Sequence, residues 1–359
     1  MGWVRDGLER IWYPEAGTAR RQFLDIALAP LEGLYRLGLA VRTPVRPQCA
    51  DGNPTVIAIG NLTSGGSGKT PLVLALAERL VNDGHRVGVL SRGYGRASRG
   101  PQIVHLPESA FAAVERVGDE PLMLARRCPA VAVIVAEHRL AAAALAQWAW
   151  QPQLLILDDA FQHRRIAREH NLLAVHARRG FGNGHVLPRG PLREPLKAMG
   201  RASLVVFTHV REESIEELRA RHSIPPELPA IRVAFTPDGF SVGPLLERAS
   251  FDGAGGPVVA VCAIADPQGF LATCRQAGLT VARLLAFPDH HRFSEADLSR
   301  IADTARACDA QAIVATEKDL VRLGPVPGWQ VFGLRIAAKF LDEETYPSVH
   351  EKLFGSVGK

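Results

Sequence analysis

A glycine-rich loop near residue 65 constrains the fold of this chain more than any other feature of its sequence. The loop is TSGGSGKT, Thr63–Thr70, and it follows the apolar run Pro54–Gly60 and precedes a helical pattern at Pro71–Asn82. A short, continuous apolar run predicts a strand that is buried on both faces of a parallel sheet. Glycines let backbone N–H groups surround phosphate oxygens, and the N-terminus of the helix adds a favourable dipole. The sequence therefore predicts a P-loop that binds a nucleoside triphosphate.

The residues of this loop have separate expected roles. Lys69 is expected to reach the β- and γ-phosphates, and the Thr70 hydroxyl is expected to ligate Mg²⁺. Thr63 stands where the usual pattern has a glycine, which is the one departure. The alternative, a glycine-rich turn that precedes Lys-Thr by chance, does not account for the flanking strand and helix. The predicted nucleotide-binding residues are Thr63, Ser64, Gly65, Gly66, Ser67, Gly68, Lys69 and Thr70.

A second segment supplies acidic residues at the end of a strand. The apolar run Leu154–Leu157 is followed directly by Asp158 and Asp159. P-loop enzymes use an acidic residue in such a place to hold Mg²⁺ beside the phosphates. An acidic loop after a buried strand is the simpler alternative. Because a P-loop lies upstream, we expect Thr70, Asp158 and Asp159 to form the metal site.

Strands and helices alternate along most of the chain after residue 54. Further strands are expected at Val87–Ser91, Val131–Val135, Leu172–His176 and Leu204–Thr208. This alternation predicts an α/β fold with a P-loop NTPase-like core of parallel strands, which binds ligands at the carboxyl ends of the strands. A proline-rich stretch at 211–257 is expected to lead into a second, smaller α/β domain. The expected divisions are 1–50, 51–220 and 221–359.

The segment at residues 20–42 is expected to form an N-terminal amphipathic helix. It combines many apolar residues with Arg20, Arg21, Arg36 and Arg42. Such a helix can lie in a bilayer interface, with arginines toward anionic headgroups. It can also pack on the core of its own protein, which composition alone slightly favours. Pro30 is expected to kink or divide it.

Charge and composition narrow the classes of partner. The formal net charge of +5 fits an anionic ligand. No basic and aromatic run suggests stacking on single-stranded nucleic acid. The five cysteines are scattered without a CxxC pair, so neither zinc nor a disulfide framework is indicated. No apolar stretch reaches the roughly 20 residues of a spanning helix, and the charged N-terminus lacks the pattern of a secretory signal.

Seven motifs, in this order, resemble the tetraacyldisaccharide 4'-kinase family. They are GNLTSGGSGKTP (60–71), SRGYGR (91–96), GDEP (118–121), LDDAFQH (157–163), LPRGPLRE (187–194), FPDHHRF (287–293) and ATEKDLVRL (315–323). The resemblance implies transfer of the ATP γ-phosphoryl group to the 4'-hydroxyl of a tetraacylated glucosamine disaccharide 1-phosphate. It also implies two α/β units with the active site in the cleft between them, and peripheral attachment to the cytoplasmic face of the bacterial inner membrane. That attachment moves our interpretation of residues 20–42 toward membrane docking.

The resemblance also implies catalytic residues. It makes Asp119 the base that accepts the proton of the acceptor hydroxyl, with His290 modulating it and Lys69 on the phosphates. Asp289 is expected to cap a helix or to orient its neighbour. An ordinary helix N-cap is the alternative for Asp119.

Residues near the nucleotide or the acceptor are implied in the same way. Arg139, Arg193, Glu194 and His163 match charged or polar positions that the family uses there. An arginine there can neutralise charge on the transferring group or bind the substrate 1-phosphate. A solvated helix charge is an equal alternative for Arg139. Lys318 and Asp319 are expected to form a surface pair or, less favoured, to position the second domain.

Two other functions use the same P-loop. A switch or partitioning ATPase would bind proteins and hydrolyse ATP slowly, without need of the distant DHH motif. A kinase of a soluble metabolite would leave residues 20–42 without a membrane role. The lipid kinase implies ATP, Mg²⁺ and an acylated disaccharide phosphate, and no nucleic acid or protein partner.

Overall fold

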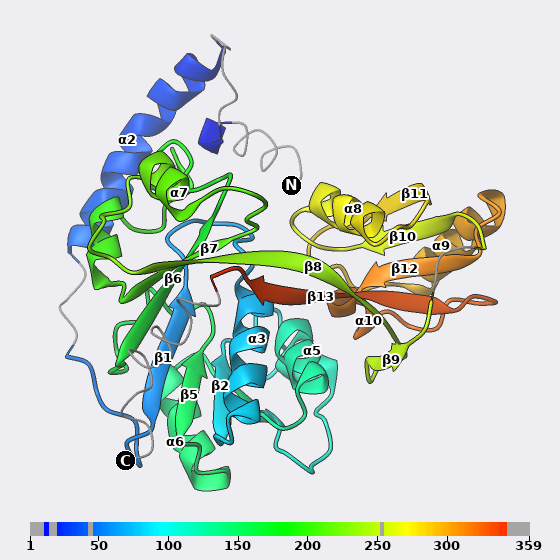
Figure 1. Ribbon diagram of the computed structural model, residues 1–359, viewed down its shortest axis with the longest axis horizontal. Coiled ribbons are helices and arrows are strands. Elements are labelled where there is room, and N and C mark those ends of the chain that lie inside the picture. Colours follow the sequence, from blue (N-terminus) through cyan, green and yellow to red (C-terminus); the bar gives the residue numbers. More distant parts are fainter. Residues whose placement is uncertain (1–10, 14–19, 42–45, 252–254, 343–359) are drawn as a thin grey trace. The chain divides into compact units, whose positions relative to one another are not determined.

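A computed structural model describes residues 11–13, 20–41, 46–251 and 255–342 (Figure 1). The fold is mixed α/β with mostly parallel strands, and β3 and β9 pair with their neighbours in antiparallel orientation. The chain forms two compact units that alternate along the sequence. The first comprises the described parts of Met1–Lys69, Ile156–Ala234 and Phe340–Lys359, and the second comprises those of Thr70–Leu155 and Phe235–Lys339. Whether residues 1–50, 51–220 and 221–359 are separate domains, as expected from the sequence, stays a prediction.

The first unit contains the strand that leads into the glycine-rich loop. Four parallel strands pair in the order β1 (Thr55–Gly60), β6 (His170–His176), β7 (Leu204–Thr208) and the start of β8 (Ala230–Val242). Helix α7 (Ile215–His222) begins with a capping box and packs Leu218 into the core beside these strands. The apolar strands thus confirm the predicted parallel sheet core, and their carboxyl ends lie at one edge.

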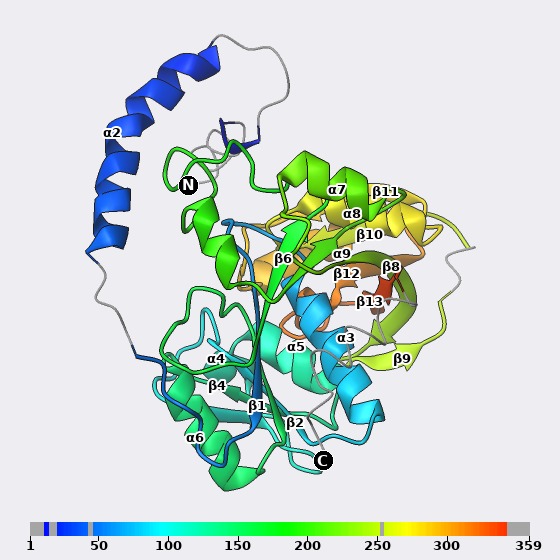
Figure 2. The same ribbon diagram turned by 60° about the vertical axis from the view of Figure 1, so that its left-hand side comes forward.

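Helix α2 (Arg20–Ala40) also belongs to the first unit, and Figure 2 shows it as one continuous helix. Pro30 lies within it, so the proline does not divide it as one expectation held. The apolar side chains of one face are half or more exposed, namely Ile26, Leu31, Leu34 and Leu37, and Val41 follows the same face just past the helix. Core packing of these side chains, the alternative that composition favoured, is therefore wrong for this face of the helix.

One part of the second unit begins with helix α3 (Lys69–Asn82), of which Thr70 onward lies in this unit. Strands β2 (Val87–Ser91) and β4 (Ala132–Val135) pair in parallel, and β3 (Gln102–His105) joins β4 in antiparallel orientation. Helices α4 (Val114–Val117), α5 (Asp119–Arg127) and α6 (Arg139–Ala149) accompany them. Strand β5 (Leu154–Leu157) lies where the chain passes from this unit to the first.

The other part of the second unit has parallel strands in the order β11 (Val281–Ala286), β10 (Val258–Cys262), β12 (Ala312–Thr316) and β13 (Val331–Phe340). Alternate residues of β10 point to opposite faces, as the two-residue repeat of a strand requires. Val258, Ala260 and Cys262 pack with helix α8 (Pro267–Gln276). Val259 and Val261 pack with helix α9 (Glu295–Ala307).

Three short elements complete the described chain. Strand β9 (Glu247–Ala249) pairs with the end of β8, helix α10 (Glu317–Leu320) follows β12, and the 3₁₀ helix η1 (Leu196–Arg201) lies in the first unit. Among the described residues, none of the helices combines the length and the apolar character needed to span a bilayer.

Candidate active site

The backbone of the glycine-rich loop explains why glycine occupies several of its positions. Gly65 and Gly68 have φ values of 119° and 69°, which side-chain-bearing residues rarely adopt. A Cβ at Gly60, the last residue of β1, would lie 2.5 Å from the backbone nitrogen of Phe161. Glycine is therefore required both for the turn and for the close approach of the acidic segment to β1.

Thr63 fills the one position where the loop departs from the usual pattern. Its side chain is buried, and its hydroxyl accepts a hydrogen bond from Nδ2 of Asn61 at 3.2 Å. The backbone N–H of Ser64 donates to the carbonyl of Pro191 at 2.6 Å, and the Thr208 hydroxyl donates to the carbonyl of Ser67 at 2.9 Å. The loop is thus held from β7 and from the LPRGPLRE motif, and a threonine fits its first position.

Lys69 and the acidic segment form a chain of opposite charges in the first unit. The Lys69 ammonium lies 3.4 Å from Oδ1 of Asp159 and 3.3 Å from Oδ1 of Asn61. The Arg193 guanidinium contacts the other oxygen of Asp159 at 3.0 Å. Burial would raise the pKa of the Asp159 carboxyl, but Lys69 and Arg193 outweigh it and hold that pKa below its usual range. Lys69, Asp159 and Arg193 therefore lie together in the first unit.

The donors expected for a metal are oxygen atoms, which suit Mg²⁺. Asp158 directly follows β5 and is buried, Asp159 is its more exposed neighbour, and Thr70 is half-buried in the first turn of α3. The described residues contain no cluster of three or more metal-ligating side chains. A site with few carboxylates is nevertheless what Mg²⁺ uses when phosphate oxygens and water complete its shell. The residues present therefore fit a magnesium ion that arrives with a nucleotide.

Asp119 and His290, which lie 171 positions apart, meet in the second unit. Nδ1 of His290 lies 3.0 Å from Oδ2 of Asp119. The same Oδ2 lies 2.9 Å from the Arg322 guanidinium, while Oδ1 accepts the backbone N–H of Glu120 at 2.9 Å.

Gly118, not Asp119, is the N-cap of α5, so the N-cap alternative is wrong. The Tyr94 ring lies against His290 with centroids 5.1 Å apart.

The remaining nitrogen of His290 faces a lysine. The Lys318 ammonium lies 3.3 Å from Nε2 of His290, 3.3 Å from Asp289 and 3.1 Å from Glu120. An ammonium group can only donate, so Nε2 accepts and the proton of the neutral ring is assigned to Nδ1, which donates to Asp119. Asp289 also lies 3.8 Å from the His290 ring, and Ser294, not Asp289, is the N-cap of α9.

The groups around Asp119 shift the pKa of its carboxyl. Burial alone would raise it, but the hydrogen bond from His290 and the charges of Lys318 and Arg322 outweigh burial. The pKa of the Asp119 carboxyl therefore lies below its usual range. Asp119 is held ionised, the form in which a carboxylate can accept a proton.

Two expectations from the sequence are corrected by burial. Asp319 is fully buried and Lys318 nearly so, so they are no surface pair. Arg139 is also buried, with Nη1 donating to the carbonyl of Ala136 at 2.8 Å, so it is no solvated helix charge. Sequence alone suggested neither result because charged residues at helix ends are usually exposed.

The other predicted residues take different places in the first unit. Glu194 is buried and pairs with Arg201, whose guanidinium also lies 4.9 Å from the ring centre of Phe161. His163 is half-buried in the turn after Phe161, where its N–H donates to the carbonyl of Ala160. The sequence analysis missed Arg322 and Asn61 as site residues, although both lie within the motifs that it quoted.

The strand, P-loop and Lys69–Asp159 pair define a P-loop kinase fold. A family model described as tetraacyldisaccharide-1-P 4'-kinase matches residues 24–353. The tetraacyldisaccharide 4'-kinase of Anaeromyxobacter dehalogenans strain 2CP-C is 38% identical over 328 residues, 89% of this chain and 86% of that one. That of Geobacter metallireducens is 40% identical over 276 residues, 76% of this chain and 80% of that one.

A solved structure gives the same result. The LpxK of Aquifex aeolicus, crystallised in complex with ATP, superposes with a TM-score of 0.73 at 29% identity, covering 92% of this chain and 99% of that one. This chain belongs to the tetraacyldisaccharide 4'-kinase family. The predicted family, the predicted fold class and the predicted kinase activity are confirmed.

Proposed function

We propose that this chain transfers the γ-phosphoryl group of ATP to the 4'-hydroxyl of a tetraacyldisaccharide 1-phosphate in lipid A biosynthesis. The observation that carries the proposal is the family match across residues 24–353, which spans both the P-loop and the Asp119–His290 pair. The relatives that match are named for this reaction. A switch ATPase would have no use for a buried, ionised carboxylate paired with a histidine.

The loop from Thr63 to Thr70 binds the triphosphate in this account. Backbone N–H groups of residues 64–69 surround the phosphates, and Lys69 leaves Asp159 for the β- and γ-phosphate oxygens. Thr70, Asp158 and Asp159 would hold Mg²⁺, which would neutralise charge on the phosphates when bound. Positioning and charge stabilisation supply most of the rate enhancement.

Asp119 accepts the proton of the sugar hydroxyl. Each oxygen of a carboxylate can accept about two hydrogen bonds. Oδ2 contacts both His290 and Arg322, whereas Oδ1 accepts the N–H of Glu120. Oδ1 is therefore the atom with remaining capacity. His290 fixes the carboxylate and shares the proton as it arrives, with Asp289 beside it.

Four further side chains serve the nucleotide or the acceptor. Arg193 is proposed to move from Asp159 toward the transferring phosphoryl group, because its guanidinium already contacts the carboxylate beside Lys69. Arg139 is proposed to bind phosphate. Glu194 and His163 are proposed to shape the acceptor side, with Glu194 fixed by Arg201.

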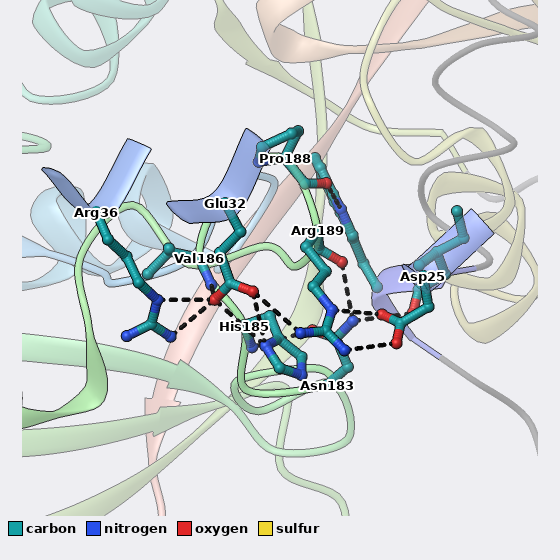
Figure 3. A network of polar contacts seen from close by, with 10 residues as sticks. Asp25, Glu32, Arg36, Asn183, His185, Val186, Pro188 and Arg189 are labelled. Carbon is teal, nitrogen blue, oxygen red and sulfur yellow. Dashed lines mark hydrogen bonds and ion pairs between the residues drawn. The ribbon is translucent and has the colours of Figure 1, made fainter. Parts of the chain in front are cut away.

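Helix α2 is proposed to dock on the membrane that holds the acylated substrate. Ile26, Leu31, Leu34 and Leu37 are exposed. Asp25 and Glu32, on another face, bind Arg189 (Figure 3). Arg36, His185 and the backbone N–H of Val186 also contact Glu32. A helix attached through its polar face presents its apolar face to a bilayer interface. The proposed location is peripheral, on the cytoplasmic face of the bacterial inner membrane.

Transfer of label from γ-labelled ATP to the tetraacyldisaccharide 1-phosphate in detergent micelles tests the proposal. Wild type is expected to label the lipid, and Lys69→Ala and Asp119→Ala are expected to lose nearly all transfer. Asp119→Ala should still bind ATP, because its effect falls on the acceptor. ATP hydrolysis by wild type without labelled lipid would replace the lipid kinase with the switch ATPase.

A further inference from the structure

Arg322 links the Asp119 carboxylate to a second, fully buried carboxylate. Its Nη1 lies 2.9 Å from Oδ2 of Asp119, and its Nη2 lies 2.5 Å from Oδ1 of Asp319. Asp319 has no exposed surface, and the Arg322 side chain is only 9% exposed. The guanidinium group thus lies between two carboxylates in the second unit.

Asp319 is itself held by neutral donors. Its Oδ2 accepts the backbone N–H of Ala263 at 2.9 Å and the hydroxyl of Thr316 at 2.6 Å. Thr316 is also the N-cap of α10 and accepts the N–H of Asp319. These bonds leave the Asp319 carboxylate little freedom to turn, so it presents a fixed oxygen to Arg322.

Arg322 and His290 also share a hydrogen-bond acceptor. The carbonyl of Ala263, at the end of β10, accepts Nη2 of Arg322 at 3.0 Å and the backbone N–H of His290 at 3.2 Å. Arg322 therefore contacts both the carboxylate of the Asp119–His290 pair and the carbonyl that fixes the backbone of its histidine. A planar guanidinium group with several donors in a rigid fork can hold such a set, and an ammonium group cannot.

The charges around Asp119 give Arg322 a second effect. His290 follows β11, Lys318 lies in α10, Arg322 follows α10 and Glu120 lies in α5 beside Asp119. Lys318, which pairs with Glu120 and Asp289, also lowers the pKa of Asp119. Arg322 is the cation in direct contact with the carboxylate, and an adjacent arginine typically lowers the pKa of an aspartate by about 1–3 units.

We propose that Arg322, held in place by Asp319, is a positioning residue that orients the Asp119 carboxylate toward His290 and keeps it ionised. The inference rests on the proposed role of Asp119 as the base. Arg322 acts through Asp119 and does not touch the reacting groups in this account. Its removal should therefore alter proton transfer and leave ATP binding unchanged.

Three variants separate the charge of Arg322 from its geometry. Arg322→Gln removes the charge, so the acid limb of the kcat/KM profile should move upward by about 1–3 pH units. Arg322→Lys keeps the charge and loses the fork, so the acid limb should stay near that of wild type while kcat falls by up to about 100-fold. Asp319→Asn keeps an acceptor oxygen for Ala263 but loosens Arg322, so kcat should fall without an upward shift of the limb.

The control is Arg306→Gln. Arg306 pairs with Asp303 at the same three-residue spacing and at 2.5 Å, but on the exposed face of α9. It should match wild type in kcat, KM and pH profile, and KM for ATP should stay within about twofold in all variants. A wild-type acid limb and kcat in Arg322→Gln would overturn the proposal.

A titration of the Asp119 carboxyl carbon by ¹³C NMR tests the same claim without the lipid. The Asp119 pKa should be higher in Arg322→Gln than in wild type and unchanged in Arg306→Gln. If Arg322→Gln does not fold by circular dichroism, Arg322→Lys and Asp319→Asn decide, and wild-type kcat in both would reject the proposal. If wild type does not label the lipid, the proposed function is rejected. The NMR titration needs no lipid, so it still tests whether Arg322 lowers the pKa of Asp119.

Discussion

The Lys69 ammonium lies 3.4 Å from Oδ1 of Asp159, so the lysine of the P-loop is paired with a residue of the expected metal site. ATP has to displace this contact if Lys69 is to reach its phosphates. Lys69→Ala should lower kcat by about 10²–10³-fold, since a preorganised charge next to the transferring group is lost. Steady-state kinetics with labelled ATP measure this fall in kcat. Lys197→Ala, at an exposed lysine, is the control. Equal kcat in Lys69→Ala and Lys197→Ala would contradict the role.

His290 occupies a strained backbone position, with φ of 58°. Glycine adopts that region freely, and other residues there cost roughly 1–2 kcal/mol. His290→Gly should therefore be more stable than His290→Ala by about 1 kcal/mol in urea unfolding. Both variants should lose about 10²-fold or more in kcat, because Asp119 loses its proton partner. A His290→Gly protein no more stable than His290→Ala would show that the strain is absent in solution.

The exposed apolar face of α2 should govern membrane binding. Leu34→Glu and Leu37→Glu together should strongly reduce cosedimentation with vesicles that contain anionic lipid, because the apolar face no longer enters the interface. ATP binding should not change. Trp148→Glu in α6 is the matched control, since Trp148 is 81% exposed but lies in the second unit. Undiminished vesicle binding by the double variant would contradict docking through α2.

The ion pairs of Asp25 and Glu32 with Arg189, which anchor α2 to the first unit, should weaken in acid. Burial would raise the pKa of Glu32, but Arg36, His185 and the Val186 N–H outweigh it, so the pKa of Glu32 in the folded state lies below its usual range. A depressed folded pKa stabilises the anchor above the unfolded pKa, and that stabilisation is lost as pH falls through the folded value. Hydrogen exchange of α2 amides should accelerate relative to α7 below about pH 4.5. Glu32→Gln should remove that pH dependence, and an unchanged dependence in this variant would assign it to another group.

Much of the fold followed from the sequence because its signals are local. The apolar run at Thr55–Gly60 directly precedes its glycine-rich loop, and β5 directly precedes its two aspartates, so each pattern lies within a few residues of the chain. The same applies to β10, β11 and β12 of the second unit. The pattern of strands and helices therefore predicted the parallel strands and the P-loop correctly.

The contacts around Asp119 join residues that are distant in sequence, so local patterns could not predict them. Asp119, His290 and Arg322 come from three separate segments that only the fold unites. The burial of Asp319 is hidden for the same reason, since its partner Ala263 lies 56 positions away. The direction of α2 was also open: an amphipathic pattern shows two faces, but the contact of Asp25 with Arg189 decides which one meets the protein.

The position of the transferred phosphate tests the central claim most directly. Wild type should convert the tetraacyldisaccharide 1-phosphate and ATP into a bisphosphorylated lipid, in which ¹H–³¹P correlation NMR connects the new phosphorus to H4' of the distal sugar. Asp119→Ala should give almost none of that product while it still binds ATP. A phosphate on another hydroxyl, or ADP formed without a phosphorylated lipid, would contradict the account.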